Sequence, residues 1–131
     1  LSLNRRGPFV TFALDGVSYA IKTQPNFRVH LIAAIIAISA GFYFNLTSAE
    51  WSVIVFIIGL VFITEMINTS IESVVDLHTE KFHELAKVAK DVSAGMVLTT
   101  AAMAVITGLL VFLPYLLTAL AKGQFAFGGK L

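Results

Sequence analysis

The middle of the chain carries four polar side chains that fall on one side of an otherwise apolar segment. They are spaced by three, four and four residues: Glu65, Asn68, Glu72 and Asp76. At about 100° per residue, this spacing places all four on a single helix face. Carboxylates and an amide gathered in this way can accept a proton and bind a divalent cation. The spacing therefore predicts a reactive face, which we name the acidic stripe.

Depth in a membrane separates the roles of two stripe residues. A helix that begins near Glu50 and rises about 1.5 Å per residue brings Glu65 roughly 22 Å in and Glu72 roughly 33 Å in, against a hydrocarbon layer about 30 Å thick. A carboxylate at the depth of Glu65 is costly and by default functional, and it suits a general base. Glu72 lies at the water, where a hard oxygen can hold a divalent cation.

The scarce charge of the chain is concentrated around this stripe, because six of the eight acidic residues lie within 64–91. Lysines in the 77–91 loop would provide cations for phosphate. Two alternatives stay open: interhelical hydrogen bonding for the stripe, and local helix pairs among Glu84, Lys87 and Asp91. Phosphoryl transfer needs chiefly positioning and charge neutralisation, so the pattern favours transfer from a nucleotide to a lipid hydroxyl. Proton transport through a small channel subunit is the competing use of an intramembrane carboxylate.

The composition places these residues in a membrane. The 131 residues are 57% hydrophobic and 13% charged, with a mean hydropathy of +0.86, whereas soluble domains carry about 25% charged residues. This excludes a disordered chain. A net charge of +1 leaves no basic face, so no nucleic-acid partner is expected. The absence of cysteine excludes disulfides, thiolate zinc sites and cysteine catalysis.

The hydropathy pattern predicts an all-α integral membrane protein with one domain over residues 1–120. Three apolar runs reach the length of a span, at about 29–46, 49–76 and 86–117. Thr47 and Glu50 have capping-box spacing at the start of the second run. Pro114 is expected to stop or bend the third helix. Residues 121–131 are expected to form a flexible tail.

The spacing of apolar residues in the segment 5–23 predicts an amphipathic surface helix rather than a membrane-spanning helix. Thr23 to Asn26 is expected to be the turn that ends it. Its apolar residues recur at helical spacing: Phe9, Phe12, Ala13, Gly16, Val17, Ala20 and Ile21. Basic residues precede the first span and separate the second from the third, while the short connection around 45–48 has none. The positive-inside rule therefore predicts a cytoplasmic N-terminus.

The segment from Glu65 to Asp76, EMINTSIESVVD, resembles the signature of the small bacterial integral-membrane diacylglycerol kinase family, which includes undecaprenol kinases. Further blocks resemble the same family in order and spacing: Phe82-His83-Glu84-Leu85, Ala89-Lys90-Asp91 and Ala94-Gly95. Residues 26–30, Asn-Phe-Arg-Val-His, are more similar to the undecaprenol kinase branch. The resemblance covers about residues 5–117.

This resemblance implies a homotrimer in the bacterial cytoplasmic (inner) membrane, with active sites between subunits and with ATP and Mg²⁺ as co-substrate and cofactor. The acceptor is a membrane lipid alcohol, either undecaprenol or diacylglycerol. By residue, the resemblance implies Glu65 as the general base and Glu72 as a magnesium ligand, with Asn68, Asp76 and Glu84 shaping the site. Implied nucleotide contacts are Arg5, Phe12, Lys81, Phe82, His83, Lys90 and Asp91.

Gln24 departs from the family pattern, because the family has a second acidic metal ligand at this position. A glutamine oxygen can bind magnesium but brings no charge. The alternative function is therefore a catalytically impaired family member that acts as a membrane scaffold.

Overall fold

The computed structural model describes residues 8–78 and 81–123, and this part of the chain contains helices and short connections but no strand. The four helices are α1 (Phe9–Thr23), α2 (Pro25–Phe44), α3 (Ser48–His78) and α4 (Glu84–Ala121). By length and composition, α2, α3 and α4 can each cross a membrane. The predicted all-α class with three candidate spans is confirmed. Arg5 and most of the predicted tail lie outside the described residues.

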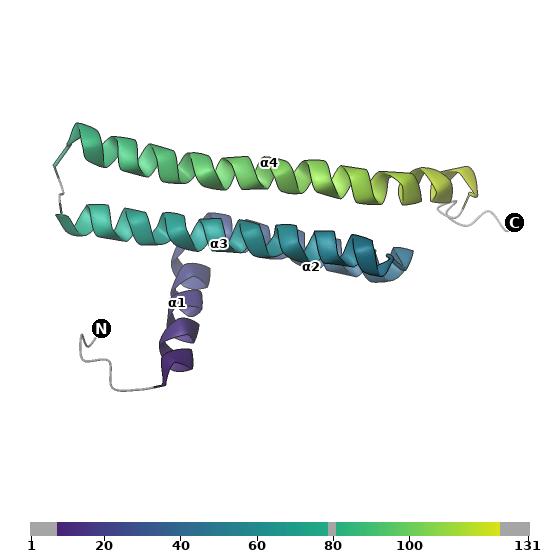
Figure 1. Cartoon of the computed structure of the whole chain (residues 1–131), viewed down its shortest axis with the longest axis horizontal. Coiled ribbons are helices and arrows are strands. Elements are labelled where there is room, and N and C mark those ends of the chain that lie inside the picture. The colour runs from purple at the N-terminus through teal and green to yellow at the C-terminus, as the bar shows by residue number, and fades with distance from the viewer. Residues whose placement is uncertain (1–7, 79–80, 124–131) are drawn as a thin grey trace, which may run out of the picture.

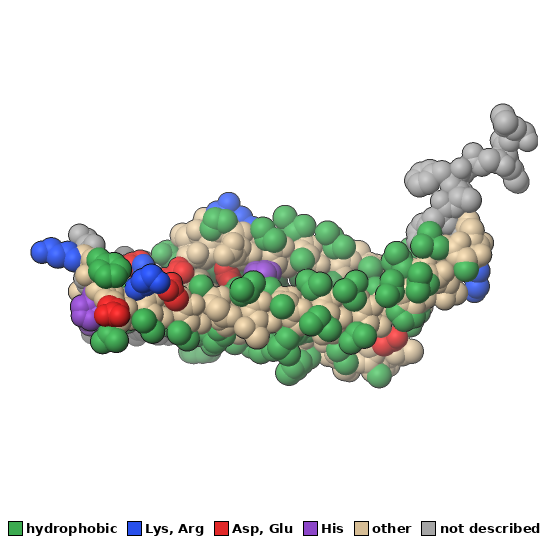
Figure 2. Space-filling model, turned by 90° about the horizontal axis from the view of Figure 1, so that it is seen from above, with side chains coloured by type: hydrophobic (Ala, Val, Ile, Leu, Met, Phe, Trp, Pro, Cys, Tyr) green, Lys and Arg blue, Asp and Glu red, His purple; other side chains and the backbone are tan. Residues whose placement is uncertain are grey.

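The three long helices run side by side, and α1 crosses their direction (Figure 1). Helix α3 is central, since it packs against α4, α2 and α1. The tip of the α3–α4 hairpin extends beyond the start of α2 (Figure 1). Figure 2 shows hydrophobic side chains along the length of the molecule, with most charged side chains of that face gathered toward one end. The fold therefore brings charge to the end where α1 leaves the bundle.

The junction between α1 and α2 is tighter than the turn predicted over Thr23 to Asn26, because only Gln24 is outside a helix. Pro25 occupies the first turn of α2, where its missing N–H costs nothing and its fixed φ suits a helix. The Arg28 guanidinium donates from Nε to Ile21 O (2.8 Å) and from Nη2 to Lys22 O (2.6 Å). This side chain caps the end of α1 and holds it against the start of α2.

At the opposite end, the predicted capping box at Thr47 and Glu50 is confirmed. The Thr47 N–H donates to Glu50 Oε2 (2.8 Å), and the Glu50 N–H donates to Thr47 Oγ1 (3.3 Å). Glu50 Oε2 also accepts from Tyr115 Oη (2.9 Å), which ties the start of α3 to the end of α4. Trp51 packs directly on Gly41, where an added Cβ would lie 2.7 Å from the indole ring.

Helix α4 is longer than the sequence predicted. It begins at Glu84, so residues 84–91 are helical rather than part of a loop, and it runs through Pro114 to Ala121. Of the two effects expected of Pro114, a stop or a bend, the stop does not occur, because long apolar helices tolerate a proline when the freed carbonyl finds other partners.

Helix α1 packs against α2 and α3. Ala20 is buried and Val17 and Phe12 are half-buried, but Phe9 is 82% exposed. The predicted surface location of this helix stays a prediction.

Candidate active site

The acidic stripe lies on α3 with burial that decreases along the helix. Glu65 is 1% exposed and Asn68 is 7% exposed, whereas Glu72 is half-buried and Asp76 is exposed. This gradient follows the direction of α3 toward the hairpin tip. The same helix face therefore offers one enclosed carboxylate and one that reaches the surface.

The enclosed carboxylate of Glu65 has an oxygen without a hydrogen-bond partner. Among the buried polar side-chain atoms of the described residues, Glu65 Oε2 is the one that lacks such a bond. Burying a carboxylate that lacks some of its hydrogen-bond or ionic partners costs on the order of several kcal/mol. Buried Glu65 therefore lowers the stability of the folded protein. Buried ionisable groups of this kind are common at functional sites.

Asn68 links the stripe to α4 and orients Glu72. Its Nδ2 donates to Glu72 Oε1 (3.0 Å), and its Oδ1 accepts from Ser93 Oγ (2.7 Å). Ser93 is itself buried and lies 2.9 Å from the backbone oxygen of Lys90. Glu72 is therefore held in place through an amide that α4 anchors.

Two ion pairs lie near the hairpin tip. Lys90 Nζ contacts Asp76 Oδ1 at 2.5 Å, which joins α4 to the last member of the stripe. Lys87 pairs with Asp91 one turn along α4, and both side chains are about 60% exposed. The alternative that some of this charge forms local helix pairs is thus confirmed for Lys87 and Asp91. Exposed pairs of this kind add at most about 1 kcal/mol to stability.

The segment before α4 has a structural use that the sequence did not predict. His83 is the N-cap of α4, where its Nδ1 accepts from the Leu85 N–H (3.2 Å). Lys81, Phe82 and Glu84 are exposed beside it. His83 also lines a hollow of about 370 Å³ together with Val74, Val75, His78 and Ala86. These positions lie at the same hairpin tip as Lys90.

Two other predicted site residues lie in a separate part of the chain. Phe12 is half-buried on α1, and Gln24 is half-buried at the α1–α2 junction. The Gln24 N–H donates to Ala20 O (2.9 Å). Within the described residues, no hydrogen bond joins the Gln24 side chain to Glu72. A metal-binding role for Gln24 therefore stays a prediction.

Sequence reasoning missed the hydroxyls that connect α3 to α4. Ser93 bonds to Asn68, and Thr100 Oγ1 lies 2.8 Å from Thr64 Oγ1. All three hydroxyl residues are buried. A signal was available, since Lys90, Ser93 and Thr100 are spaced by three and seven residues and so share one face of an apolar helix.

The side-chain oxygens near Glu72 suit magnesium only if the phosphates of a bound nucleotide supply further ligands. No group of three or more His, Asp or Glu side chains that could hold a metal occurs in residues 8–78 and 81–123. Mg²⁺ is usually bound by one or two carboxylates, several waters and substrate phosphates rather than by an all-protein cage. Glu72, oriented by Asn68, is suited to that mode of binding.

These features define a helical membrane protein with a carboxylate-lined site at one end of the bundle. A model of the prokaryotic diacylglycerol kinase family matches residues 11–112. The chain belongs to this family, and the prediction of a lipid kinase is confirmed at that level.

Similar proteins carry two different names within this family. The chain is 43% identical over 114 residues to an undecaprenol kinase of Bacillus subtilis. The aligned residues make up 87% of this chain and 93% of that protein. It is 45% identical over 108 residues to a diacylglycerol kinase of Synechocystis, covering 82% of this chain but only 62% of the relative. A diacylglycerol kinase of Escherichia coli is 29% identical over 96 residues.

Proposed function

We propose that this protein is an ATP-dependent kinase that transfers the γ-phosphoryl group to the hydroxyl of a membrane lipid alcohol. The observation that carries the proposal is the unpartnered Oε2 of buried Glu65, one turn from the Asn68–Glu72 pair. Glu65 accepts the proton of the lipid hydroxyl, and the hydroxyl oxygen bonds to the γ-phosphorus. The bond from that phosphorus to the β–γ bridging oxygen breaks, and ADP leaves with the electron pair. Glu72 would hold a magnesium ion bound with the nucleotide, and that ion would supply positive charge against the phosphates.

The remaining site residues surround that centre in the proposal. Glu72 binds the metal–nucleotide complex, and Asn68 fixes the orientation of Glu72. Asp76 and Glu84 shape the site. The nucleotide contacts are the residues that the family resemblance assigned: Arg5, Phe12, Lys81, Phe82, His83, Lys90 and Asp91. Lys90 supports this assignment, since its ammonium group lies beside the stripe at the hairpin tip.

The lipid is proposed to be undecaprenol rather than diacylglycerol. The Asn-Phe-Arg-Val-His sequence at residues 26–30 favours it, and the undecaprenol kinase of B. subtilis matches this chain over nearly the whole length of both proteins. We expect purified protein with ATP and magnesium to phosphorylate undecaprenol faster than diacylglycerol when each is offered alone in mixed micelles. Measuring labelled phosphate in the lipid fraction checks this.

The two possible failures of that assay have different meanings. Faster turnover of diacylglycerol would reverse the choice of lipid and leave the kinase intact. Phosphorylation of neither lipid, by a protein that is folded and binds ATP, would contradict the proposed activity.

The site is proposed to face the cytoplasm of a bacterium from its cytoplasmic membrane. Basic residues flank the hairpin tip and the α1–α2 junction, as the positive-inside rule requires of cytoplasmic segments. ATP is delivered on that side, so the proposed orientation and the proposed co-substrate agree.

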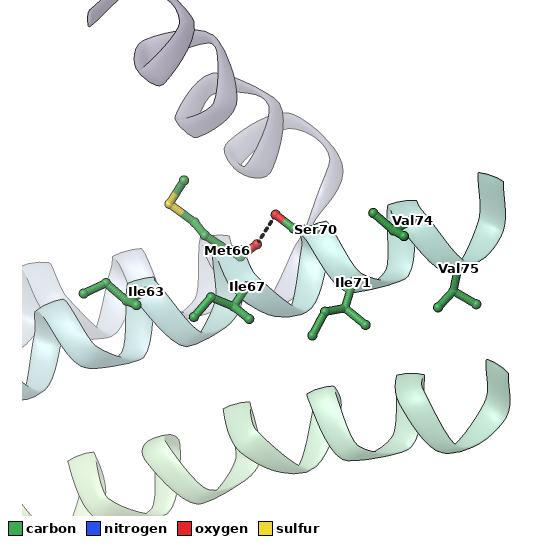
Figure 3. A pocket seen from close by; sticks show the side chains of 7 residues that line it. All are labelled: Ile63, Met66, Ile67, Ser70, Ile71, Val74 and Val75. Atoms are coloured by element: carbon green, nitrogen blue, oxygen red, sulfur yellow. Dashed lines mark hydrogen bonds between the residues drawn. The ribbon is translucent and has the colours of Figure 1, made fainter. Parts of the chain in front are cut away.

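Self-association into a trimer is proposed to complete the site. An open apolar surface runs along α3, lined by Ile63, Met66, Ile67, Ser70, Ile71, Val74 and Val75 (Figure 3). It extends past Glu72 to the level where the stripe becomes exposed, so part of it would face water in a lone chain. A second copy of the chain would cover this surface. The trimeric number follows from the family resemblance, and native mass spectrometry in detergent measures it.

Gln24 provides a specific test of the metal site. Replacing it with glutamate adds a carboxylate at the position where the family pattern has one, and magnesium affinity rises with ligand charge. We expect Gln24→Glu to reach half its maximal rate at an about tenfold lower magnesium concentration. Initial rates across a magnesium titration check this, with Gln24→Leu as the uncharged control.

The same titration separates the kinase from the alternative of an impaired family member that acts as a scaffold. Activity only in Gln24→Glu would show that glutamine inactivates the natural chain. An unchanged magnesium dependence would remove position 24 from the metal site.

A further inference from the structure

The hollow at the hairpin tip presents two histidine rings together with three small apolar side chains. Its volume is about 370 Å³, and it is lined by Val74, Val75, His78, His83 and Ala86. Both histidines are exposed at this tip, so a ligand from water can reach them. His83 is among the nucleotide contacts that the family resemblance implies, whereas none of the roles given above uses His78.

Backbone hydrogen bonds fix which nitrogen of each ring carries the proton. His78 Nδ1 lies 3.1 Å from Val74 O. A carbonyl oxygen only accepts, so this Nδ1 donates, and Nε2 of the neutral ring is left as an acceptor. His83 Nδ1 accepts from the Leu85 N–H (3.2 Å), so Nε2 of that ring carries the proton and donates. The two rings therefore offer one acceptor and one donor to a ligand in the hollow.

One acceptor beside one donor is complementary to an edge of adenine. On that edge the N6 amino group of adenine donates and N7 accepts. Guanine has O6 and N7 on the same edge, and both accept, so guanine would leave the acceptor of His78 unpaired. A polar group left unpaired in a site is a strong source of discrimination between ligands. The apolar side chains of Val74, Val75 and Ala86 suit the flat faces of a purine ring, so the hollow favours adenine over guanine.

The hollow continues the proposed nucleotide site toward the hairpin tip on both helices. On α3, Val75 lies three residues after Glu72, the proposed ligand of the metal–nucleotide complex. On α4, Ala86 lies four residues before Lys90, a proposed nucleotide contact. Residues three or four apart are neighbours on a helix surface. A base in the hollow would thus lie about one turn nearer the tip than the groups proposed to bind the phosphate end of the nucleotide.

We propose that this hollow binds the adenine base of the nucleotide, and that His78 is the residue that determines base specificity. His78 Nε2 accepts from the N6 amino group, and His83 Nε2 donates to N7. This inference rests on the proposed kinase function and adds to it the identity of the base and the atoms that recognise it. The phosphates extend from the hollow toward the acidic stripe.

Binding of non-hydrolysable β,γ-methylene triphosphates tests the base without catalysis. At about pH 8, where imidazole side chains are mostly neutral, we expect the natural chain to bind the adenosine analogue about tenfold or more tightly than the guanosine analogue. His78→Phe, which has no acceptor, should lose most of this preference. His78→Arg should reverse it, because arginine donates to both O6 and N7 of guanine. Equilibrium titration in detergent with magnesium measures the affinities.

Leu77→Arg is the matched control, since it adds the same charge at the next position, where the side chain is 82% exposed and does not line the hollow. It should change the affinity for both analogues by the same factor. Equal binding of the two analogues by the natural chain, or the natural preference retained in His78→Arg, would overturn the inference.

Analogues altered in the base provide a second test that needs no variant at His83. The N6,N6-dimethyl analogue cannot donate, so the natural chain should bind it about tenfold more weakly than the adenosine analogue, whereas His78→Phe should bind the two about equally. An equal penalty in both proteins would remove His78 from the base site, and this comparison decides if His78→Arg does not fold. Adenine preference in a chain that phosphorylates no lipid would support the base site while the kinase proposal fails. Lipid phosphorylation without any base preference would do the reverse.

Discussion

Replacing Glu65 with glutamine is expected to abolish lipid phosphorylation while leaving the fold as stable as before. Glutamine has nearly the same shape but cannot accept the hydroxyl proton, and general bases contribute about 10²–10⁴-fold to rates. The folded protein loses no hydrogen bond at Oε2, because this atom has none within the described residues. Removing a buried charge also removes its desolvation cost. Initial rates and thermal unfolding in detergent measure the two effects.

Glu50→Gln is the matched control, because it makes the same chemical change at the opposite end of α3. Glu50 accepts from Thr47 and Tyr115, so its replacement should lower the free energy of unfolding slightly and leave the turnover unchanged. Equal turnover by Glu65→Gln and the natural chain would remove Glu65 from its role as the base. A loss of fold in Glu65→Gln would instead reveal a structural role.

Replacing Glu72 with glutamine is expected to weaken the use of ATP rather than the acceptance of the proton. The variant keeps an oxygen for Asn68 but loses the negative charge that attracts magnesium. We expect kcat/KM for ATP to fall by roughly 10²-fold or more at low magnesium. Part of this loss should return as magnesium is raised, because mass action restores the bound metal. A magnesium titration at fixed lipid concentration checks this.

Glu65→Gln is the contrasting variant in the same titration, since added magnesium cannot replace a missing base. Glu50→Gln should follow the natural chain at every magnesium concentration. A Glu72→Gln variant whose activity does not respond to magnesium would contradict the ligand assignment. In that case the hydrogen bond from Asn68 would hold Glu72 for a structural purpose.

The long helices could be predicted from the sequence because hydropathy and capping are local properties. The capping box at Thr47 depends on residues three apart, and each span depends on its own apolar run. The errors occurred where a residue usually interrupts a helix. Pro25 occupies the first turn of α2 and Pro114 lies within α4, because a proline's effect depends on its position relative to the helix start and on the surrounding helices.

The candidate site was predictable along α3 and much less so across helices. The spacing of Glu65, Asn68 and Glu72 on one face follows from the helix period alone. The bond from Ser93 to Asn68 depends on the relative placement of α3 and α4, which no local pattern fixes.

The pair between Lys90 and Asp76 has a consequence for the speed of the catalytic cycle. A phosphate that binds Lys90 would compete with a carboxylate that is already there, so its gain in free energy would be reduced by the existing ion pair. The same carboxylate can reclaim the ammonium group when the spent nucleotide leaves. If Lys90 contacts the nucleotide as proposed, its ammonium group would pass from one anion to another, and this would favour rapid exchange of ADP for ATP over tight binding of the nucleotide.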